Sequence, residues 1–167
     1  GYRLEMRSYL MTCTPEDLKS LVDVEGVTVR RLTDGSPLSD FQALMTVQAR
    51  SFGPADAPAT GPADAETFRR RFASNAFYGA KINGEMVGVG AYTSPADGVT
   101  ELVGIATLPA FRGRGIAGLV TWRATADAFA AGVDLAFLTA GDERAGRVYA
   151  RVGYQAAGHG CAWVLPG

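Results

Sequence analysis

The segment 104–119 constrains the fold more than any other part of the chain, because it joins a strand to a helix through a glycine-rich turn. An apolar run reaches Pro109, three glycines follow within six residues, and an alanine-rich amphipathic stretch comes next. A turn with few Cβ atoms lets backbone N–H groups approach a ligand, and the following helix adds its dipole and unpaired first-turn donors. With Arg112 and Arg114 in the turn, the segment predicts a site for an anionic group such as a phosphate.

The composition limits which classes of anionic ligand the protein can bind. The 167 residues are 47% hydrophobic and 20% charged, which suits one globular domain with a sizeable core. Sixteen basic and seventeen acidic side chains give a net charge of −1, so no field of one sign is available to hold nucleic acid or a membrane surface. We therefore expect a local anion site, with neither nucleic acid nor a membrane as a partner.

The two cysteines and the N-terminal residues indicate the compartment in which the protein is expected, which is the cytoplasm. Cys13 and Cys161 match no metal or redox spacing, so reduced thiols in a cytoplasmic protein without a metal site are the simplest interpretation, and a disulfide is the alternative. The sequence has no secretory leader and no apolar run of membrane-spanning length. It begins within a strand-like run, which leaves open that upstream residues or a preceding domain are missing.

A strand and a short helix are expected at the start of the chain. Residues 2–11 alternate apolar with polar side chains, as a half-buried strand does. Thr14, Pro15 and Asp17 have the pattern of a helix N-terminus with its capping residues. We interpret residues 1–26 as an extension, which leaves open that it is the remnant of a preceding domain.

Residues 27–75 predict a second strand and two helices joined by a loop. The strand covers 27–32, and Ser36-Pro37 begins the first helix. The apolar side chains expected on one face of that helix are Phe41, Leu44, Met45 and Ala49. Three prolines and two glycines in 53–62 predict a surface loop, and 63–75 return to helical spacing.

Three antiparallel strands are predicted to lead into the glycine-rich turn. Residues 76–82 and 85–93 flank Asn83-Gly84, a dipeptide that readily takes the positive φ angles of a type I′ hairpin turn. A second break at 95–98 leads into a strand over 99–108.

The elements expected after the turn are a helix, a strand, a helix and two strands: residues 114–131, 135–140, 142–152, 154–159 and 161–165. Gly132 and Gly153 would end the two helices. The strand 135–140 is apolar, so we expect it to be buried on both faces, and its helical crossover makes it parallel to 99–108. The predicted fold is therefore α/β (α+β): a mixed, mostly antiparallel sheet with one parallel pair and helices on both faces.

Two motifs overlap in the glycine-rich turn. Residues 113–118 satisfy G-x-G-x-x-G, and Asp142 stands where a ribose-binding acid of a dinucleotide site would be expected. A nicotinamide-dependent oxidoreductase is disfavoured, because antiparallel strands precede the turn and four residues separate the strand from the first glycine. The second motif is Arg112-x-x-Gly115-x-Ala117, preceded by a strand that ends in Leu-Pro.

The second motif resembles the acetyl-coenzyme A signature of the GNAT superfamily of N-acetyltransferases, Gln/Arg-x-x-Gly-x-Gly/Ala. Ala145-x-x-Val148-Tyr149-x-x-x-Gly153-Tyr154 is in turn similar to the helix that carries the family's catalytic tyrosine. The two motifs occur in the family's order, separated by a helix and a strand. We therefore interpret residues 27–167 as a GNAT-like acyltransferase domain.

The resemblance implies a coenzyme A site that extends from the strand through the turn. The pyrophosphate would lie on the turn, and the pantetheine arm would pair with a backbone edge that is exposed where the two parallel strands splay apart. The cofactor-binding residues implied are Ile105, Thr107, Arg112, Gly113, Arg114, Gly115, Ile116, Ala117, Gly118 and Asp142. Asp142 replaces an asparagine of many relatives, and an N-cap role is its alternative.

The resemblance also implies direct transfer of an acetyl group from acetyl-coenzyme A to an amine of a small molecule or peptide. Tyr149 would be the general acid, since its ordinary pKa of about 10 is close to that of a thiol. Glu101 is the candidate general base, and a side chain that merely faces solvent is its alternative. A non-catalytic acyl-coenzyme A sensor is the alternative function. The acceptor and a possible homodimer are left open.

Overall fold

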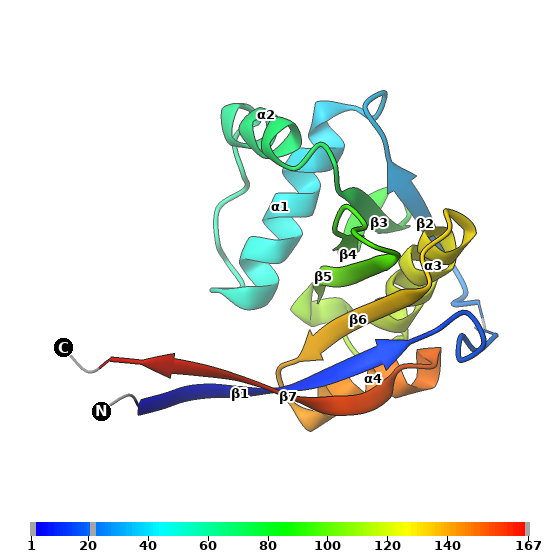
Figure 1. The fold of residues 1–167 in the computed structure, drawn as a ribbon. Helices are drawn as coiled ribbons and strands as arrows, with labels where there is room; N and C mark the ends of the chain where they lie inside the picture. The colour runs from blue at the N-terminus through cyan, green and yellow to red at the C-terminus, as the bar shows by residue number, and fades with distance from the viewer. Residues whose placement is uncertain (1–2, 21–22, 166–167) are drawn as a thin grey trace.

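Seven strands form one mixed sheet in the structure, a computed structural model that describes residues 3–20 and 23–165 (Figure 1). The strands lie in the order β2-β3-β4-β5-β6-β1-β7. The elements are β1 (Arg3–Cys13), β2 (Val27–Leu32), α1 (Leu38–Phe52), α2 (Pro62–Arg71), β3 (Ala76–Ile82), β4 (Glu85–Tyr92), β5 (Val99–Thr107), the 3₁₀ helix η1 (Pro109–Phe111), α3 (Ile116–Ala130), β6 (Leu135–Ala140), α4 (Glu143–Val152) and β7 (Gln155–Val164).

The strand pairing confirms the predicted fold class. In the described part of the chain, β5 and β6 are parallel and all other paired strands are antiparallel. Between β3 and β4, Asn83 and Gly84 have φ angles of 48° and 85°, as a type I′ turn requires. Gly132 and Gly153 follow α3 and α4 with φ angles of 91° and 129°, so both predicted helix ends are confirmed.

Each face of the sheet carries its own hydrophobic cluster, because successive strand residues point to opposite faces. Phe77 of β3 packs with α1 and α2, whereas its neighbour Tyr78 packs with α3. Figure 1 shows these helices on opposite sides of the strands. Since helices cover both faces here, almost every residue of β3 and β4 is buried.

Residues 15–20 do not form the helix predicted after Thr14, although its capping contacts form. Asp17 Oδ2 accepts hydrogen bonds from the Thr14 N–H at 3.2 Å and from Thr14 Oγ1 at 2.9 Å. The next backbone groups bind other elements instead of continuing a helix: the Lys19 N–H donates to Val152 O at 2.9 Å, and Lys19 O accepts from Trp122 Nε1 at 2.8 Å. Contacts with α3 and α4 therefore override the local helix signal.

The prediction of two final strands was wrong, because one strand, β7, covers 155–164. The two glycines within it do not form a turn. A Cβ on Gly160 would lie 2.8 Å from Ser8 Oγ of β1, so this glycine permits close packing between neighbouring strands. Ala157 has no partner on β1 and marks a bulge in the pairing.

Two burial predictions were also wrong. Strand β6 is not buried on both faces: Ala136 and Leu138 are buried in the cluster under α3, but Thr139 between Leu138 and Ala140 is exposed. In α1, Ala49 is exposed while Val47 takes its place in the core. The apolar composition of these segments predicted the elements correctly but not which faces the neighbouring elements cover.

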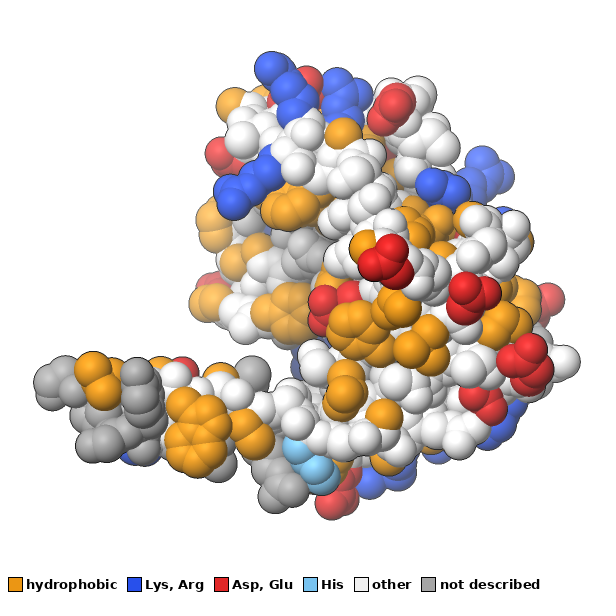
Figure 2. Space-filling model, in the orientation of Figure 1, with side chains coloured by type: hydrophobic (Ala, Val, Ile, Leu, Met, Phe, Trp, Pro, Cys, Tyr) orange, Lys and Arg blue, Asp and Glu red, His pale blue; other side chains and the backbone are white. Residues whose placement is uncertain are grey.

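Strand β1 is an internal strand of the sheet. Its residues 9–13 pair with β6, and its residues 3–12 pair with β7. Residues 3–8 pair with β7 alone, so this part of the two strands projects as an arm (Figure 1). On the face in Figure 2 the surface is hollowed between this arm and the helices α1 and α2, and basic and acidic side chains are interspersed.

The two cysteines are free thiols, with Cys13 buried and Cys161 exposed. Burial, and to a lesser extent the charge of Asp17, raises the pKa of the Cys13 thiol from 9.0 to about 11. Because the thiolate is the reactive form, Cys13 is a packing residue near neutral pH. In residues 3–20 and 23–165, no helix has the length and apolarity needed to cross a membrane.

Candidate functional site

The candidate site is organised by a distortion of β5. The pairing of β4 with β5 shifts register between Val89/Ala106 and Ala91/Val103, which leaves an extra residue on β5 as in a β-bulge. Gly104 lies in this bulge with a φ of 61°, a left-handed conformation that favours glycine. Its carbonyl accepts a hydrogen bond from Gln48 Nε2 of α1 at 3.2 Å, so α1 holds the bulge in place.

Beyond the bulge β5 separates from β6. The two strands pair only between 99–101 and 135–137, while β6 continues beside β1. Within the described part of the chain, residues 102–107 of β5 therefore have no partner strand on that edge, as the prediction of a splayed parallel pair expected. Backbone N–H and C=O groups along this edge are available to an extended ligand.

The glycine-rich turn ends in an uncapped helix. Gly113 and Gly115 have φ angles of 81° and 83°, and a Cβ added at Gly113 would meet nothing within 4 Å. Gly115 is the N-cap of α3 and has no side chain to cap it, so the first helical hydrogen bond runs from Leu119 N–H to Gly115 O. The preceding N–H groups, of 116–118, lack intrahelical partners and can bind an anion.

A cavity of about 740 Å³ joins the splayed strand, the turn and α4. The predicted site residues that line it are Ile105, Thr107, Arg112, Gly113, Gly115, Ile116, Ala117, Gly118, Asp142 and Tyr149. Arg114 and Glu101 do not line it. The guanidinium of Arg114 lies over the Phe111 ring, 5.1 Å from its centroid, in a cation–π contact.

Several lining residues were missed by sequence reasoning. Arg144, Arg147 and Arg151 line the cavity from α4, where a spacing of three and four residues places them on one helix face. That spacing beside the Tyr149 motif was a signal that could have identified them. Ser51 and Phe52 line the cavity from the end of α1, and only the tertiary fold brings them there.

Arg112 links two elements that end at the cavity. Its Nε donates to Thr107 O at 3.3 Å, at the end of β5, and its Nη2 donates to Ser51 O at 3.0 Å, in the last turn of α1. A cation at this helix end also interacts favourably with the helix dipole. The side chain of Arg112 therefore positions β5 against α1, and its predicted pyrophosphate contact stays a prediction.

Ser51 and Thr107 share a further property. The Ser51 Oγ and Thr107 Oγ1 atoms are buried and have no hydrogen-bond partner among the described residues. Buried hydroxyl groups usually have partners, because leaving one unpaired costs free energy. Both hydroxyls belong to residues that line the large cavity.

Tyr149 lines the same cavity. Its ring packs edge-on against Tyr154, with centroids 6.4 Å apart and planes at 64°. Burial, with a smaller contribution from the charge of Asp142, raises the pKa of the Tyr149 hydroxyl above its usual value of 10. The hydroxyl is therefore protonated near neutral pH, and no residue in the described part of the chain hydrogen-bonds to it, so it is available as a donor.

Asp142 caps α4. Its Oδ1 accepts a hydrogen bond from the Ala145 N–H at 2.7 Å, a geometry that typically stabilises a helix by about 1 kcal/mol. This confirms the N-cap interpretation of Asp142. Because the residue also lines the cavity, its charge acts on Tyr149.

Glu101 lies on the other face of β5. It is two residues before Val103, which packs in the cluster under α1, while Leu102 packs in the cluster under α3. Glu101 is half-buried, and its carboxylate has no hydrogen-bond or ion-pair partner within 3–20 and 23–165. The structure does not bring Glu101 and Tyr149 into one cavity, so the base role of Glu101 stays a prediction.

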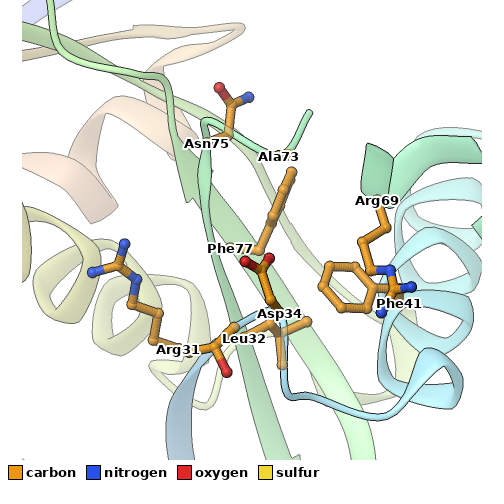
Figure 3. Close-up of a pocket in the computed structure, with 9 residues that line it drawn as sticks. Arg31, Leu32, Asp34, Phe41, Arg69, Ala73, Asn75 and Phe77 are labelled. Atoms are coloured by element: carbon orange, nitrogen blue, oxygen red, sulfur yellow. The ribbon is translucent and has the colours of Figure 1, made fainter. Parts of the chain in front are cut away.

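A second cavity, of about 260 Å³, lies between the β2–β3 edge and the helices α1 and α2. Its apolar floor includes Phe41 and Phe77, whose rings meet edge-on at 6.2 Å. Figure 3 shows the Asp34 carboxylate between Arg31 and Arg69 at the rim. The second cavity shares no lining residue with the large cavity, and none of the predicted site residues lines it.

Three rim residues of this second cavity already have partners. Arg69 forms an ion pair with Glu66 at 2.7 Å. The guanidinium of Arg31 lies 5.9 Å from the centroid of the Tyr92 ring. Asn75 Oδ1 accepts a hydrogen bond from the Ser94 N–H at 3.3 Å.

The mixed sheet with its splayed parallel pair and glycine-rich turn has the fold of an acyltransferase, and the comparisons with known proteins agree. Residues 41–154 match the acetyltransferase (GNAT) family. The match covers more than half of the chain, so the chain belongs to the acetyltransferase (GNAT) family. The comparison with curated protein sequences gave no match.

Solved structures show the same fold. The chain is similar to a GCN5-related N-acetyltransferase from Kribbella flavida, with a TM-score of 0.77, 29% identity and coverage of 100% of this chain and 61% of that chain. A GCN5-related N-acetyltransferase from Sphaerobacter thermophilus gives a TM-score of 0.74 and 19% identity, with coverage of 100% and 54%. A tandem GNAT protein from the clavulanic acid biosynthesis pathway gives 0.70 and 11%, with coverage of 98% and 55%. The chain thus spans about three fifths of the length of these proteins, or less.

Proposed function

We propose that the protein is an acetyl-coenzyme A-dependent N-acetyltransferase that transfers the acetyl group directly to an amine of a small molecule or peptide. The observation that carries this proposal is the meeting of three features in one cavity. These are the unpaired edge of β5, the uncapped N-terminus of α3, and Tyr149.

The residues of the cavity fit coenzyme A. Its pyrophosphate requires donors and positive charge, which the N–H groups of 116–118 and the arginines of α4 supply. Its pantetheine arm is an extended chain with amides, which matches the free edge of β5.

The proposed chemistry assigns a proton donor to the cavity. Bound acetyl-coenzyme A supplies an acyl carbon activated by its thioester. Tyr149 is held on α4, and its raised pKa keeps its Oη protonated. As the amine attacks the acyl carbon and the carbon–sulfur bond breaks, this Oη donates its proton to the leaving sulfur. The unpaired β5 edge positions the reacting carbon, and enclosure by α1 and α4 reduces the access of water.

The attacking amine must transfer a proton to a base. The candidate base lies on the face of β5 that is opposite to Tyr149. Glu101 is half-buried, faces α1, and has no partner for its carboxylate in the described residues. We therefore propose that the acceptor amine approaches from the α1 face, with Glu101 as its general base. The loop 53–61 and the β1–β7 arm border this face and are proposed to select the acceptor.

A non-catalytic acyl-coenzyme A sensor is the second candidate function. The observation that favours it is the separation of the proposed acid and base, since Glu101 does not line the cavity that contains Tyr149. The two functions predict the same cofactor binding and differ in turnover.

Isothermal titration calorimetry of the full chain with acetyl-coenzyme A and with NADH tests the proposal. Binding of acetyl-coenzyme A alone is the expected result, and its absence would contradict both candidate functions. Release of coenzyme A with a panel of amines and peptides then separates an enzyme from a sensor. Because Cys161 is exposed and a free thiol would add to the signal of a thiol reagent, this assay uses the Cys161→Ser variant.

A further inference from the structure

The arm formed by β1 and β7 extends beyond the rest of the sheet (Figure 1). It consists of residues 3–8 of β1 and residues 160–164 of β7, which pair with each other and with no other strand in the described part of the chain. An isolated two-stranded ribbon is at best marginally stable in water, and further strands or a packed face are needed to hold it. Within residues 3–20 and 23–165, the arm therefore lacks the neighbours that such a ribbon needs.

The two edges of the sheet differ in charge. Strand β2 is one edge and β7 is the other. β2 has six residues and presents Arg30 and Arg31, both exposed, and charged side chains on an edge strand oppose pairing with another chain. β7 has ten residues, and residues 152–165 contain no Asp, Glu, Lys, Arg or Pro. The edge of β7 therefore lacks the side chains that commonly protect an edge strand.

The free edge of β7 is continuous over residues 158–164. Each of these residues has a partner on β1, and the bulge at Ala157 lies before them. In an antiparallel strand, N–H and C=O groups point alternately to the two sides. One side of β7 bonds to β1, so the other side presents a row of donors and acceptors to which a further strand can pair.

The end of β7 also exposes apolar surface. Trp163 is 58% exposed, and Leu165, directly after the strand, is 68% exposed. Figure 2 shows hydrophobic side chains along the arm. Tryptophan buries a large apolar area and is enriched among the residues that contribute most to the affinity of interfaces. A strand added to β7 would cover part of this surface.

The residues of β7 are complementary in size to a second β7 strand. The first part of the strand is small, with Ala156, Ala157 and Gly158, whereas its end carries Trp163 and Val164. In an antiparallel pair of identical strands, the large end of each strand lies beside the small end of the other, and here no like charges meet. A two-fold axis produces this arrangement.

The β2 edge of a second copy fits the β7 edge less well. It would bring Arg30 and Arg31 to a strand that has no acidic side chain to pair with them. Such a contact is also head-to-tail, so it does not close within a pair of copies and leaves a free edge at each end.

We propose that two copies of this chain associate through antiparallel pairing of their β7 strands about a two-fold axis, which joins the two sheets into one. The pairing gives each arm a neighbouring strand and buries Trp163. It goes beyond the proposed function and does not depend on it, because no residue of β7 lines the large cavity.

Sedimentation equilibrium of the full chain tests the association. The expected mass rises with concentration and approaches twice the 17.5 kDa of one chain. Trp163→Lys places a charge on the exposed edge strand and removes the tryptophan, so it should raise the dissociation constant of the dimer about 30-fold or more. A wild type that stays monomeric at roughly 100 μM would overturn the proposal. Assemblies that grow beyond two copies would overturn the two-fold pairing in favour of a head-to-tail contact.

Thr28→Lys is the matched control. Thr28 is exposed on β2, at the opposite edge of the sheet, so a lysine there should leave the dissociation constant of the dimer within about twofold. Equal weakening by both lysines would overturn the assignment to β7. A second readout needs no variant: the melting temperature of the wild type should rise with protein concentration, because association stabilises the folded chain. A melting temperature independent of concentration would contradict the dimer.

The orientation of the two strands is tested by a spin label on Cys161. This thiol is exposed whereas Cys13 is buried, and strand side chains point away from the sheet rather than along its edge. Cys161 is near the middle of β7, so its two copies should lie about 10 to 15 Å apart between Cα atoms in the antiparallel pair. A much longer distance in the dimer would contradict pairing through β7.

Coenzyme A binding separates this proposal from the proposed function. Trp163→Lys should bind coenzyme A within about twofold of the wild type, since the substitution is remote from the cavity. If the wild type forms the dimer but binds no coenzyme A, the proposed function fails and the association through β7 stands. If it binds coenzyme A as a monomer, the association fails and the proposed function stands.

Discussion

The two cavities of this protein differ in whether their polar groups already have partners within the protein. The smaller cavity has a polar rim, but Arg69, Arg31 and Asn75 are already engaged by Glu66, Tyr92 and Ser94. The larger cavity has unpaired backbone groups along β5 and at α3, and two buried hydroxyls without partners. Polar groups without a partner in the protein are free to bind a ligand, so we expect the larger cavity rather than the smaller one to be the binding site.

The largest expected effect concerns the floor of the smaller cavity. Phe41 is 3% exposed and packs against Phe77, so Phe41→Ala should lower the free energy of unfolding by about 3 to 5 kcal/mol. Chemical denaturation measures this loss. The variant, once folded at low temperature, should bind coenzyme A as the wild type does, and a comparable loss of affinity would show that the two cavities are not independent.

Replacement of Tyr149 by Phe should affect turnover and leave binding intact. The ring packing is kept and only the proton donor is lost, so turnover with a reactive amine should fall about 100-fold or more. The dissociation constant for acetyl-coenzyme A should stay within about twofold, because the proton is needed in the transition state. Steady-state kinetics and calorimetry check both values. An unchanged rate removes Tyr149 from the mechanism.

Two glycines allow a matched test of the turn. Gly113 and Gly132 both have left-handed backbones, with φ angles of 81° and 91°, and open space where a Cβ would be. Alanine at either site should cost about 1 to 2 kcal/mol of stability. Gly113→Ala should also reduce coenzyme A affinity about tenfold through poorer contact with the pyrophosphate, whereas Gly132→Ala should not. Equal affinities in calorimetry would contradict the turn as the anion site.

Asp142→Asn tests how the charge of Asp142 affects Tyr149 in the larger cavity. Asparagine also caps helices, so stability should change little. The charge of Asp142 contributes to the raised pKa of Tyr149, and its removal should lower that pKa. Because the general acid is active when protonated, the alkaline fall in rate should move to lower pH in the variant. A pH–rate profile that does not move would contradict this coupling.

The smallest effect is expected at the rim of the smaller cavity. Arg31→Ala and Asp34→Asn remove exposed charges from a site that we assign no ligand, so acetyl-coenzyme A affinity and turnover should stay within about twofold. Surface substitutions of this kind usually change stability by less than 0.5 kcal/mol. A strong effect on turnover with any acceptor would show that the smaller cavity has a function.

Local signals explain why most of the fold could be predicted. The hairpin around Asn83-Gly84, the glycine-ended helices and the strand before the turn follow from residues within a few positions of one another. The errors arose where distant segments decide the outcome. Asp17 forms its predicted cap, but contacts with Val152 and Trp122 prevent the helix.

The candidate site divides in the same way. The glycine turn and Tyr149 carry sequence motifs, and the arginines of α4 follow a helical spacing. Ser51 has no local signal, because only the packing of α1 against β5 brings it to the cavity. Glu101 lies on the α1 face of β5 because of how β5 packs on either side of the bulge at Gly104. The sequence did not predict this bulge.

The position of β1 in the sheet has a consequence for how the chain folds. β1 pairs with β6 and β7, and every partner residue lies more than a hundred positions away along the chain. Strands β2 to β5 can pair with near neighbours early, whereas β1 must wait until the segments after α3 have been made by the ribosome. Such long loop closures slow folding. We expect the region around the large cavity to be completed last, when β1 pairs with β6 and β7.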